Sequence, residues 1–224
     1  MLSEKAESFI LQSMKIDLQS IIEKLDEEGV ATHRSEIEGA IEEFIYAIIG
    51  QSSSIWQHES LLLDASPAEN TINQYATDLM DKFYNEEAKI VLDSLRHAFC
   101  SYSYGGLHQL FTRQENENWY PKVILDEVLE PNDIDALPDI VSLYRGTDSQ
   151  ELESQKYGQS WTTNKQIAHS FAFLHYQGQQ WFEGAKRLIL CADISKQHVY
   201  FSNQTCEFEV VVNTSKLVNV RVCT

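Results

Sequence analysis

Apolar residues in the first half of the chain recur at spacings of three and four, the period of an amphipathic helix. The first such run covers residues 9–25 and is expected to end at Gly29. Ser35 and Glu38 have the spacing of a capping box, so a second helix is predicted to begin there and to end at Gly50. The first 65 residues therefore predict helices.

The segment Ser66-Pro67-Ala68-Glu69 is a strong start signal for a further helix, with Ser at the cap, Pro in the first turn and Glu three residues after the cap. The apolar spacing predicts that this helix extends to about Cys100, and Gly105 with Gly106 should interrupt any continuation. The expected core positions of this helix are Ile72, Tyr75, Leu79, Phe83, Ile90, Leu92, Leu95 and Phe99.

After about Pro138 the pattern changes to short runs rich in β-branched and aromatic residues, separated by polar turns. Asn164 is expected to cap a short helix between these runs. The strands are predicted at residues 140–145, 158–164, 188–192, 199–201, 206–212 and 217–222. Helices followed by a mostly antiparallel sheet indicate the α+β class.

Charge is unevenly distributed along the chain of 224 residues, which has 34 acidic and 17 basic side chains and a net charge of −17. The net charge is −10 for residues 1–70, −8 for residues 71–142 and +1 for residues 143–224. The overall charge argues against a protein that coats nucleic acid or an anionic membrane. The acidic part is either a set of solvated helix faces or a docking surface for a basic partner.

Nothing in the sequence has the pattern of a secretory signal, and no apolar run approaches the roughly 18 residues needed to span a bilayer. The four cysteines form no C-x-x-C pair, so neither a disulfide framework nor a zinc site is expected, and buried free thiols are. We expect a cytoplasmic protein without membrane association, or one delivered into a host cytoplasm by a route that needs no signal.

Three polar features interrupt the strand-rich region. Arg145 lies at the end of an apolar strand, before Gly146, where a guanidinium can hold a phosphate or carboxylate. The segment 158–164, Gly-Gln-Ser-Trp-Thr-Thr-Asn, is a hydroxyl-rich strand that leads into a helix. Glu207 and Glu209 alternate along a predicted strand, which would place them on one face about 7 Å apart, with Phe208 in the core. Taken singly, each has an ordinary explanation: an ion pair, a helix cap and a solvated strand face.

In this order, Leu143-Tyr144-Arg145-Gly146, the segment 158–164 and Glu207-Phe208-Glu209 resemble the Arg–Ser–Glu branch of the mono-ADP-ribosyltransferases, the clostridial and cholera-toxin-like clade. The resemblance covers about residues 140–222. It implies an ADP-ribosyltransferase-like split antiparallel β-sandwich behind the N-terminal helices. The corresponding domains are an acidic helical extension, residues 1–65, and a catalytic domain, residues 66–224, with helices in 66–139 and the sheet in 140–224.

The resemblance also implies a role for each motif residue, with NAD as substrate and no metal. Glu209 would bind a ribose hydroxyl and stabilise the positive charge that develops at the anomeric carbon, and Ser160 would orient Glu209. Arg145 and Gly146 would contact NAD, with Arg145 holding its diphosphate or its ribose-phosphate portion, and Thr162 would support the nicotinamide pocket.

Other residues around the motif are less strictly specified. Glu207 would position or deprotonate the acceptor. Trp181 or Phe182 would stack on nicotinamide, and Lys186 and Arg187 are the cations available where the family often has a phosphate-binding Arg. Trp161 departs from the family pattern and would reshape the pocket.

The resemblance implies an NAD-dependent transferase that acts as a toxin or effector, and a glutamate at position 207 favours a protein arginine as acceptor. A nucleic-acid base is the second choice, with a role in an anti-phage or toxin–antitoxin system, because residues 143–224 are nearly neutral. An antitoxin or another basic protein is a possible partner of the acidic helices. An NAD glycohydrolase and a non-catalytic acidic binding module are the remaining alternatives.

Overall fold

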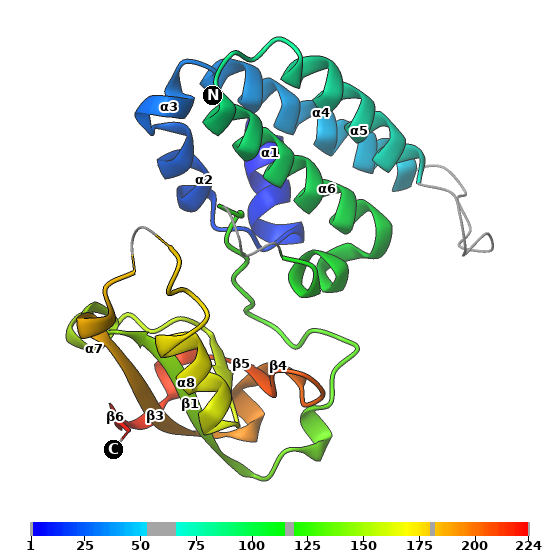
Figure 1. The fold of residues 1–224 in the computed structure, drawn as a ribbon. Coiled ribbons are helices and arrows are strands. Elements are labelled where there is room, and N and C mark those ends of the chain that lie inside the picture. Colours follow the sequence, from blue (N-terminus) through cyan, green and yellow to red (C-terminus); the bar gives the residue numbers. More distant parts are fainter. Residues whose placement is uncertain (1, 53–65, 115–118, 180–181, 224) are drawn as a thin grey trace. The chain divides into compact units, whose positions relative to one another are not determined.

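The computed structural model describes residues 2–52, 66–114, 119–179 and 182–223. The chain divides into two compact units, Met1–Ile124 and Leu125–Thr224 (Figure 1). We call them the helical unit and the sheet unit. The α+β class and the order of the elements, helices first and then antiparallel strands, are confirmed.

The helical unit consists of short N-terminal helices and three longer ones that pack together, since α4 contacts both α5 and α6. The elements are α1 (Glu4–Ser8), a π-helical turn (Phe9–Ser13), α2 (Leu18–Leu25), α3 (Glu28–Ala31), α4 (Arg34–Ser52), α5 (Pro67–Met80) and α6 (Glu86–Thr112). The aromatic centre of the core is Phe44 against Phe99, with ring centroids 5.6 Å apart.

The first predicted helix is interrupted, because residues 14–17 leave the helical conformation. Lys15 adopts a left-handed backbone with φ of 54°, and Ile16 pairs with Val123 as an isolated β-bridge. The chain restarts as α2 with Asp17 as its N-cap, and Gly29 lies inside the short α3 and does not end a helix. The bridge joins residues far apart in sequence, so helical periodicity could not reveal it.

The capping box predicted at Ser35 and Glu38 is wrong. Helix α4 begins at Arg34, so Ser35 lies within its first turn. The Glu38 carboxylate instead accepts a hydrogen bond of 2.8 Å from Nε of Arg34. Gly50 does not end the helix, which extends to Ser52.

The capping box at Ser66 is confirmed, with the Ser66 hydroxyl accepting from the Glu69 N–H at 3.0 Å. The single helix predicted from there to Cys100 is two helices, since α5 ends at Met80 and Asn85 caps the start of α6. Tyr75 on α5 and Ile90 on α6, both expected in the core, are exposed. The predicted interruption at Gly105 and Gly106 is confirmed by their non-helical backbone angles. The other six expected core residues are buried, namely Ile72, Leu79, Phe83, Leu92, Leu95 and Phe99.

The sheet unit is built on one open six-stranded antiparallel sheet of order β4-β5-β2-β1-β3-β6. Its strands are β1 (Ile140–Asp148), β2 (Ser160–Thr162), β3 (Arg187–Ser195), β4 (Val199–Asn203), β5 (Glu209–Val212) and β6 (Val218–Val222). The helices α7 (Ser149–Ser154) and α8 (Lys165–Phe173) connect strands, and short 3-10 turns lie at Ile134–Ala136, Gly184–Lys186, Lys196–His198 and Thr214–Lys216.

Pairing within the sheet is weakest at its centre. β1 pairs with β3 along its whole length, whereas β1 and β2 share a single pair, Tyr144 with Thr162. We call this short junction between β2 and β1 the division of the sheet; three strands lie on each side of it, β4-β5-β2 and β1-β3-β6, and all six belong to one sheet. Arg145 lies on one side of this division, and Ser160 lies on the other.

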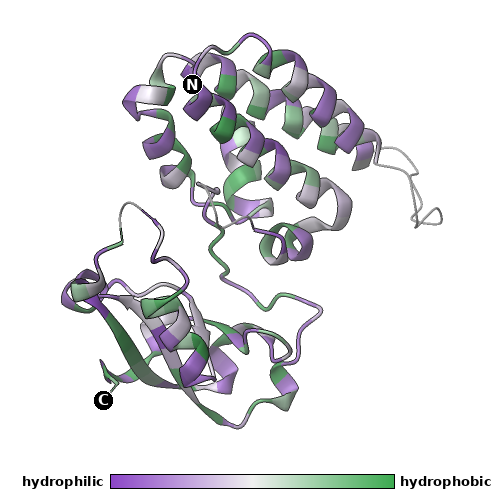
Figure 2. Ribbon diagram, viewed as in Figure 1, coloured by the Kyte–Doolittle hydropathy of each residue, from purple (hydrophilic) through white to green (hydrophobic). Residues whose placement is uncertain are grey.

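The main core of the sheet unit lies on the face where β3 contributes many of the apolar side chains, and its ribbon is mostly green in Figure 2. A second, smaller cluster of Ala168, Ala172 and Ile189 lies where α8 packs on the sheet. Helix α8 packs on β1, and Asn164 caps it as predicted by accepting from the N–H groups of Gln166 and Ile167. Ala168 is buried, whereas Leu174, at the C-terminal end of the helix, is exposed.

The predicted strand at residues 206–212 is shorter than expected, because β5 begins only at Glu209. Phe208 has a left-handed backbone with φ of 53°, which no residue inside a regular strand adopts. Glu207 therefore lies in the loop before β5, and the predicted placement of Glu207 and Glu209 on one strand face is wrong.

Division into compact units differs from the chain segments suggested by charge. The helical unit has 21 acidic and 9 basic residues, and the sheet unit has 13 and 8. The six acidic residues between 126 and 139 belong to the sheet unit, whose net charge is −5. Helices before and after residue 65 belong to the same compact unit. The division into a helical extension, residues 1–65, and a catalytic domain, residues 66–224, stays a prediction.

Two further expectations concern cysteines and membranes. Cys100 and Cys191 are buried as expected, Cys223 is half-buried, and Cys206 is exposed in the loop before β5, which corrects the expectation for that thiol. Among the described residues, no helix combines the length and apolar character that a bilayer crossing requires.

Candidate functional site

Ser160 and Glu209 meet on two neighbouring strands. The antiparallel register of β2 and β5 pairs Ser160 with Val211 and Thr162 with Glu209, which brings the Ser160 and Glu209 side chains together. The Ser160 hydroxyl donates a hydrogen bond of 2.6 Å to Oε1 of Glu209. This is the contact expected if Ser160 orients the carboxylate.

The surroundings of Glu209 make its charged form expensive. Burial raises the pKa of its carboxyl, the hydrogen bond from Ser160 lowers it, and the negative charge of Glu207 raises it, with a raised pKa as the net result. A poorly solvated carboxylate interacts strongly with any positive charge that develops beside it. That is the property needed to stabilise an oxocarbenium-like transition state.

Arg145 reaches across the division of the sheet. Its Nη1 donates to the backbone oxygen of Ser160 at 2.6 Å, which connects β1 to β2 where the strands share only one pair. Arg145, Ser160 and Glu209 are thus assembled from three strands, β1, β2 and β5. Three of the four predicted catalytic residues are brought together in this way, and their catalytic roles stay a prediction.

Glu151, which the sequence analysis did not single out, forms an ion pair with Arg145. Its Oε1 lies 2.8 Å from Nε of Arg145 and accepts from the N–H of Gly158 at 2.6 Å, while Oε2 accepts from the hydroxyl of Thr147. Burial opposes the charge of Glu151, but the charge of Arg145 and these hydrogen bonds leave its pKa below the usual value. Arg145 therefore forms the ion pair that was the ordinary explanation for its position, and this ion pair lies within the candidate site.

At two glycines beside Arg145, a side chain would collide with neighbouring atoms. A Cβ on Gly146 would lie 2.2 Å from the backbone oxygen of Ala168 and 2.5 Å from the nitrogen of Ala172, so Gly146 lets α8 approach β1. A Cβ on Gly158 would lie 2.4 Å from Nη2 of Arg145, so Gly158 leaves room for the guanidinium. Gly146 was predicted as a cofactor contact, and the packing of α8 accounts for it.

The loop before β5 places Glu207 at the surface. Thr162 donates from Oγ1 to the backbone oxygen of Glu207 at 2.7 Å, and the Thr163 N–H donates to the backbone oxygen of Phe208 at 3.0 Å. The carboxylate of Glu207 is exposed, yet close enough for its charge to raise the pKa of Glu209. Thr162, predicted to support a nicotinamide pocket, is buried and fixes this loop.

Gln204 holds the other end of the same loop, and the sequence analysis missed it. Its side chain donates to the backbone oxygen of Glu209 at 3.1 Å and accepts from the Thr163 hydroxyl at 2.6 Å. Its backbone N–H donates to Oδ2 of Asp133 at 2.7 Å. A polar residue between two strands is common, so no signal in a single sequence distinguishes Gln204.

Trp161 does not reshape the site. Strand alternation directs it away from Ser160 and Thr162 into the core, where it is 2% exposed. Its indole N–H donates to the backbone oxygen of Gly158 at 2.9 Å. The departure from the family pattern at this position therefore affects the core and leaves the hydroxyl-bearing face unchanged.

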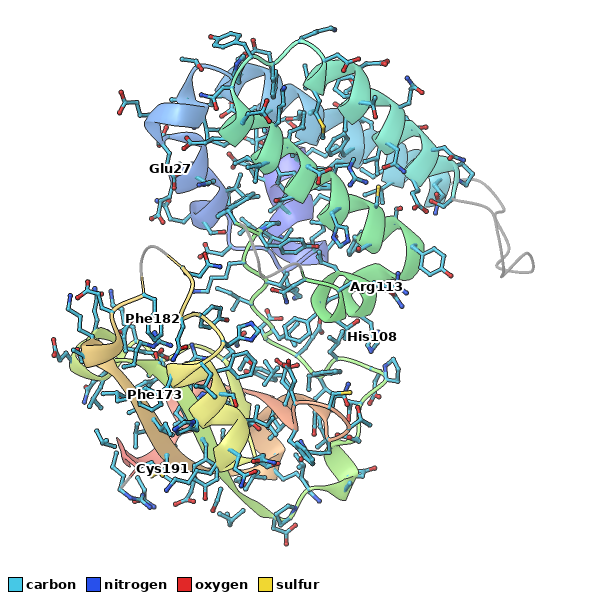
Figure 3. All side chains as sticks on the ribbon, viewed as in Figure 1. Glu27, His108, Arg113, Phe173, Phe182 and Cys191 are labelled. Carbon is cyan, nitrogen blue, oxygen red and sulfur yellow. The ribbon has the colours of Figure 1, made fainter. Side chains whose placement is uncertain are left out.

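The residues considered for stacking and phosphate binding belong to the segment that leads from α8 into β3, where Arg187 is the first residue of the strand. Trp181 falls outside the described residues, and Phe182 lies in that connecting segment (Figure 3). Arg187 donates to the backbone oxygens of Ala172 and Phe171 at 3.0 and 3.4 Å, which occupies its guanidinium at the end of α8. Lys186 is exposed and paired with Glu183 at 2.7 Å. Neither cation contacts Arg145 or Glu209 in the part of the chain that is described.

A separate hollow of about 220 Å³ lies between β1, β3 and β6. Its lining includes Ser142, Cys191, Asp193, Arg221 and Cys223, and Cys191 is labelled in Figure 3. None of the predicted site residues lines it.

Within the described ranges, no three His, Cys, Asp or Glu side chains are grouped so that they could hold a metal ion. No known protein family, curated protein or solved structure matches this chain.

Proposed function

We propose that this protein is an NAD-dependent mono-ADP-ribosyltransferase that releases nicotinamide and transfers ADP-ribose to a macromolecule. The observation that carries the proposal is the contact between Ser160 and Glu209, with Arg145 bound to the backbone of the same serine. The division of the sheet between Arg145 and Ser160 is compatible with an ADP-ribosyltransferase-like split sandwich, which is the fold we propose.

In the proposed reaction, the bond between the nicotinamide nitrogen and the ribose anomeric carbon breaks, and its electron pair leaves with nicotinamide. Positive charge develops on the ribose, and the Glu209 carboxylate stabilises it because that half-buried carboxylate is partly shielded from water. A nucleophile of the acceptor then forms a bond to the anomeric carbon. The proton that the nucleophile loses passes to Glu207, which is exposed at the loop where an acceptor would approach.

We propose a protein arginine as the acceptor. A guanidinium is recognised well by carboxylates, and Glu207 offers one at the surface beside Glu209. A net charge of −5 for the sheet unit removes the argument from neutrality that supported a nucleic-acid base. An irreversible modification of host or cellular proteins is the chemistry of a toxin or effector, and the acidic helical unit is the surface we propose for a basic partner or antitoxin.

The test is to incubate the purified protein with NAD labelled in the adenylate portion and a cell lysate, and to measure label transfer and nicotinamide release. We expect both with the wild type and neither with Glu209→Ala. Glu153→Gln is the matched control, since Glu153 is an exposed carboxylate on α7. Nicotinamide release without label transfer would instead identify a glycohydrolase, and the absence of both would leave a binding module.

Digestion of the labelled products distinguishes the acceptors. Label that survives nuclease and is located on arginine by mass spectrometry would support the proposal. Label removed by nuclease would contradict the choice of protein and identify nucleic acid as the acceptor.

A further inference from the structure

We propose that Glu151 is a positioning residue of this site, which fixes the guanidinium of Arg145 so that its remaining N–H groups bind the diphosphate of NAD. The inference rests on the proposed function and deepens it. Glu151 belongs to α7 and lies outside the three motifs that carry the resemblance.

The first step of the argument is how Glu151 is held. Its carboxylate side chain is 12% exposed and accepts hydrogen bonds from three places, namely Nε of Arg145, the N–H of Gly158 and the hydroxyl of Thr147. Asp148 caps α7 by accepting from the Glu151 N–H at 3.1 Å, which fixes the backbone as well. A carboxylate restrained from so many sides gives Arg145 one preferred orientation.

The second step is what the ion pair leaves free on Arg145. A guanidinium has five N–H groups in a rigid fork. The Nε–H donates to Glu151, and one Nη1–H donates to the backbone oxygen of Ser160. Nη2 has no hydrogen-bond partner among the described residues, so the Nη edge retains N–H groups for a bidentate contact to phosphate.

Arg187 shows what a purely structural arginine looks like in the same unit. Its Nε and Nη2 donate to backbone oxygens at the end of α8, its Nη1 lies 4.0 Å from Asp148, and its side chain is 9% exposed. Arg145 is 25% exposed, and its contacts are concentrated on the Nε side and on one Nη1–H. Among the described residues, Nη2 of Arg145 has no hydrogen-bond partner, whereas each nitrogen of the Arg187 guanidinium group lies near an oxygen atom of the protein.

A positioning role predicts a specific kinetic signature. If Arg145 binds a part of NAD that does not react, misorienting it weakens the substrate and transition-state complexes equally, which raises KM and leaves kcat unchanged. Glu151→Gln keeps the size and one acceptor oxygen but removes the charge. We expect its KM for NAD to rise about tenfold with kcat within about twofold of the wild type.

The experiment measures nicotinamide release, NAD binding by calorimetry and the thermal unfolding midpoint for the wild type, Glu151→Gln, Glu151→Ala, Arg145→Ala and the double alanine variant. Glu153→Gln on the same helix is the control and should match the wild type. If Glu151 acts through Arg145, the double variant has the KM of Arg145→Ala, because the second substitution removes nothing further.

Two results would overturn the inference. One is a wild-type KM in Glu151→Gln, even with a lower unfolding midpoint, which would make Glu151 structural only. The other is full additivity of the Glu151 and Arg145 effects on KM. If the wild type neither binds nor cleaves NAD, the proposed function fails, and the inference fails with it. If the wild type cleaves NAD and only the Glu151 effects are absent, the inference alone fails.

Discussion

Two carboxylates, Glu38 in the helical unit and Glu209 in the sheet unit, have pKa values that their surroundings shift in opposite directions. In the helical unit, Glu38 is largely buried, and although burial opposes its charge, hydrogen bonds that include one from Arg34 lower its pKa. In the sheet unit, the carboxylate of Glu209 accepts from the hydroxyl of Ser160, and burial together with the charge of Glu207 raises its pKa. Among the described residues, Glu38 is paired with the cation Arg34 on its own helix, whereas the side chain that contacts the Glu209 carboxylate is the uncharged Ser160.

The same contrast appears in how the units use charge. The helical unit has the larger excess, a net −12, and most of its described acidic residues are exposed. The sheet unit has a smaller excess, a net −5, but three of its carboxylates, Glu151, Glu207 and Glu209, lie around one division of the sheet. Net charge is therefore a property of the helical unit's surface, whereas at the candidate site the burial of individual carboxylates affects their pKa values.

The largest expected effect comes from Glu209→Gln. We expect nicotinamide release to fall about 10³-fold, because the amide cannot stabilise positive charge on the ribose. The unfolding midpoint should not fall at pH 7. A carboxyl whose folded pKa is raised loses stability as the pH rises through its unfolded and folded pKa values, and glutamine removes that cost.

Kinetics and thermal unfolding on the same preparation check this prediction. A large drop in the unfolding midpoint would mean that Glu209 is a structural group like Glu38. The contrast between the two units would then be wrong.

Glycine substitutions test packing in the two units. Gly146→Ala should destabilise the sheet unit by about 2–3 kcal/mol, because the new Cβ would meet the backbone of Ala168 and Ala172 on α8, which cannot move aside as a side chain can. Gly39→Ala is the matched control on α4, where a Cβ meets nothing within 4 Å. It should stabilise the helical unit by about 0.5–1 kcal/mol. Denaturant titration followed by circular dichroism measures both changes, and equal effects would contradict the tight approach of α8 to β1.

Ser160→Ala should have a smaller effect on rate, about 10-fold to 100-fold in kcat, and a characteristic effect on pH dependence. The hydroxyl lowers the pKa of Glu209, so its loss raises that pKa and moves the acidic limb of the kcat/KM profile to higher pH.

Glu207→Gln removes a negative charge that raises the pKa of Glu209, so it should move the same limb to lower pH. Shifts in the same direction for both variants would show that Glu209 does not control the limb.

Local signals in the sequence predicted the elements that depend on local interactions. The capping box at Ser66, the cap at Asn164 and the interruption at Gly105 and Gly106 are all confirmed, because each depends on residues within one helical turn. The incorrect predictions have a common cause. The bridge of Ile16 to Val123 and the pairing of Glu38 with Arg34 are competing contacts that periodicity does not register.

The candidate site divides in the same way. Ser160 and Glu209 were predicted to cooperate, and the strand register brings them into contact. The predicted strand from 206 to 212 was wrong, because Phe208 turns the chain with a left-handed backbone. Glu151 and Gln204 were missed because they act through backbone groups and loops, for which a single sequence has no periodic signal.

The smallest expected effect is a pH dependence of stability in the helical unit, where Glu38 has a lowered pKa. A carboxyl with a depressed folded pKa adds stability that is fully present above its unfolded pKa and is lost as the pH falls through its folded pKa. Glu38→Gln should therefore lower the unfolding midpoint slightly at pH 7, and the difference from the wild type should shrink as the pH falls through the folded pKa of Glu38, because the wild type then loses the same contribution. Nicotinamide release should be unchanged, because Glu38 belongs to α4 of the helical unit.

Thermal unfolding of both proteins between pH 3 and 7 measures the difference. A gap between the two midpoints that widens as the pH falls would mean that the Glu38 pKa is raised, and that the surroundings of Glu38 and Glu209 act on their carboxylates in the same direction.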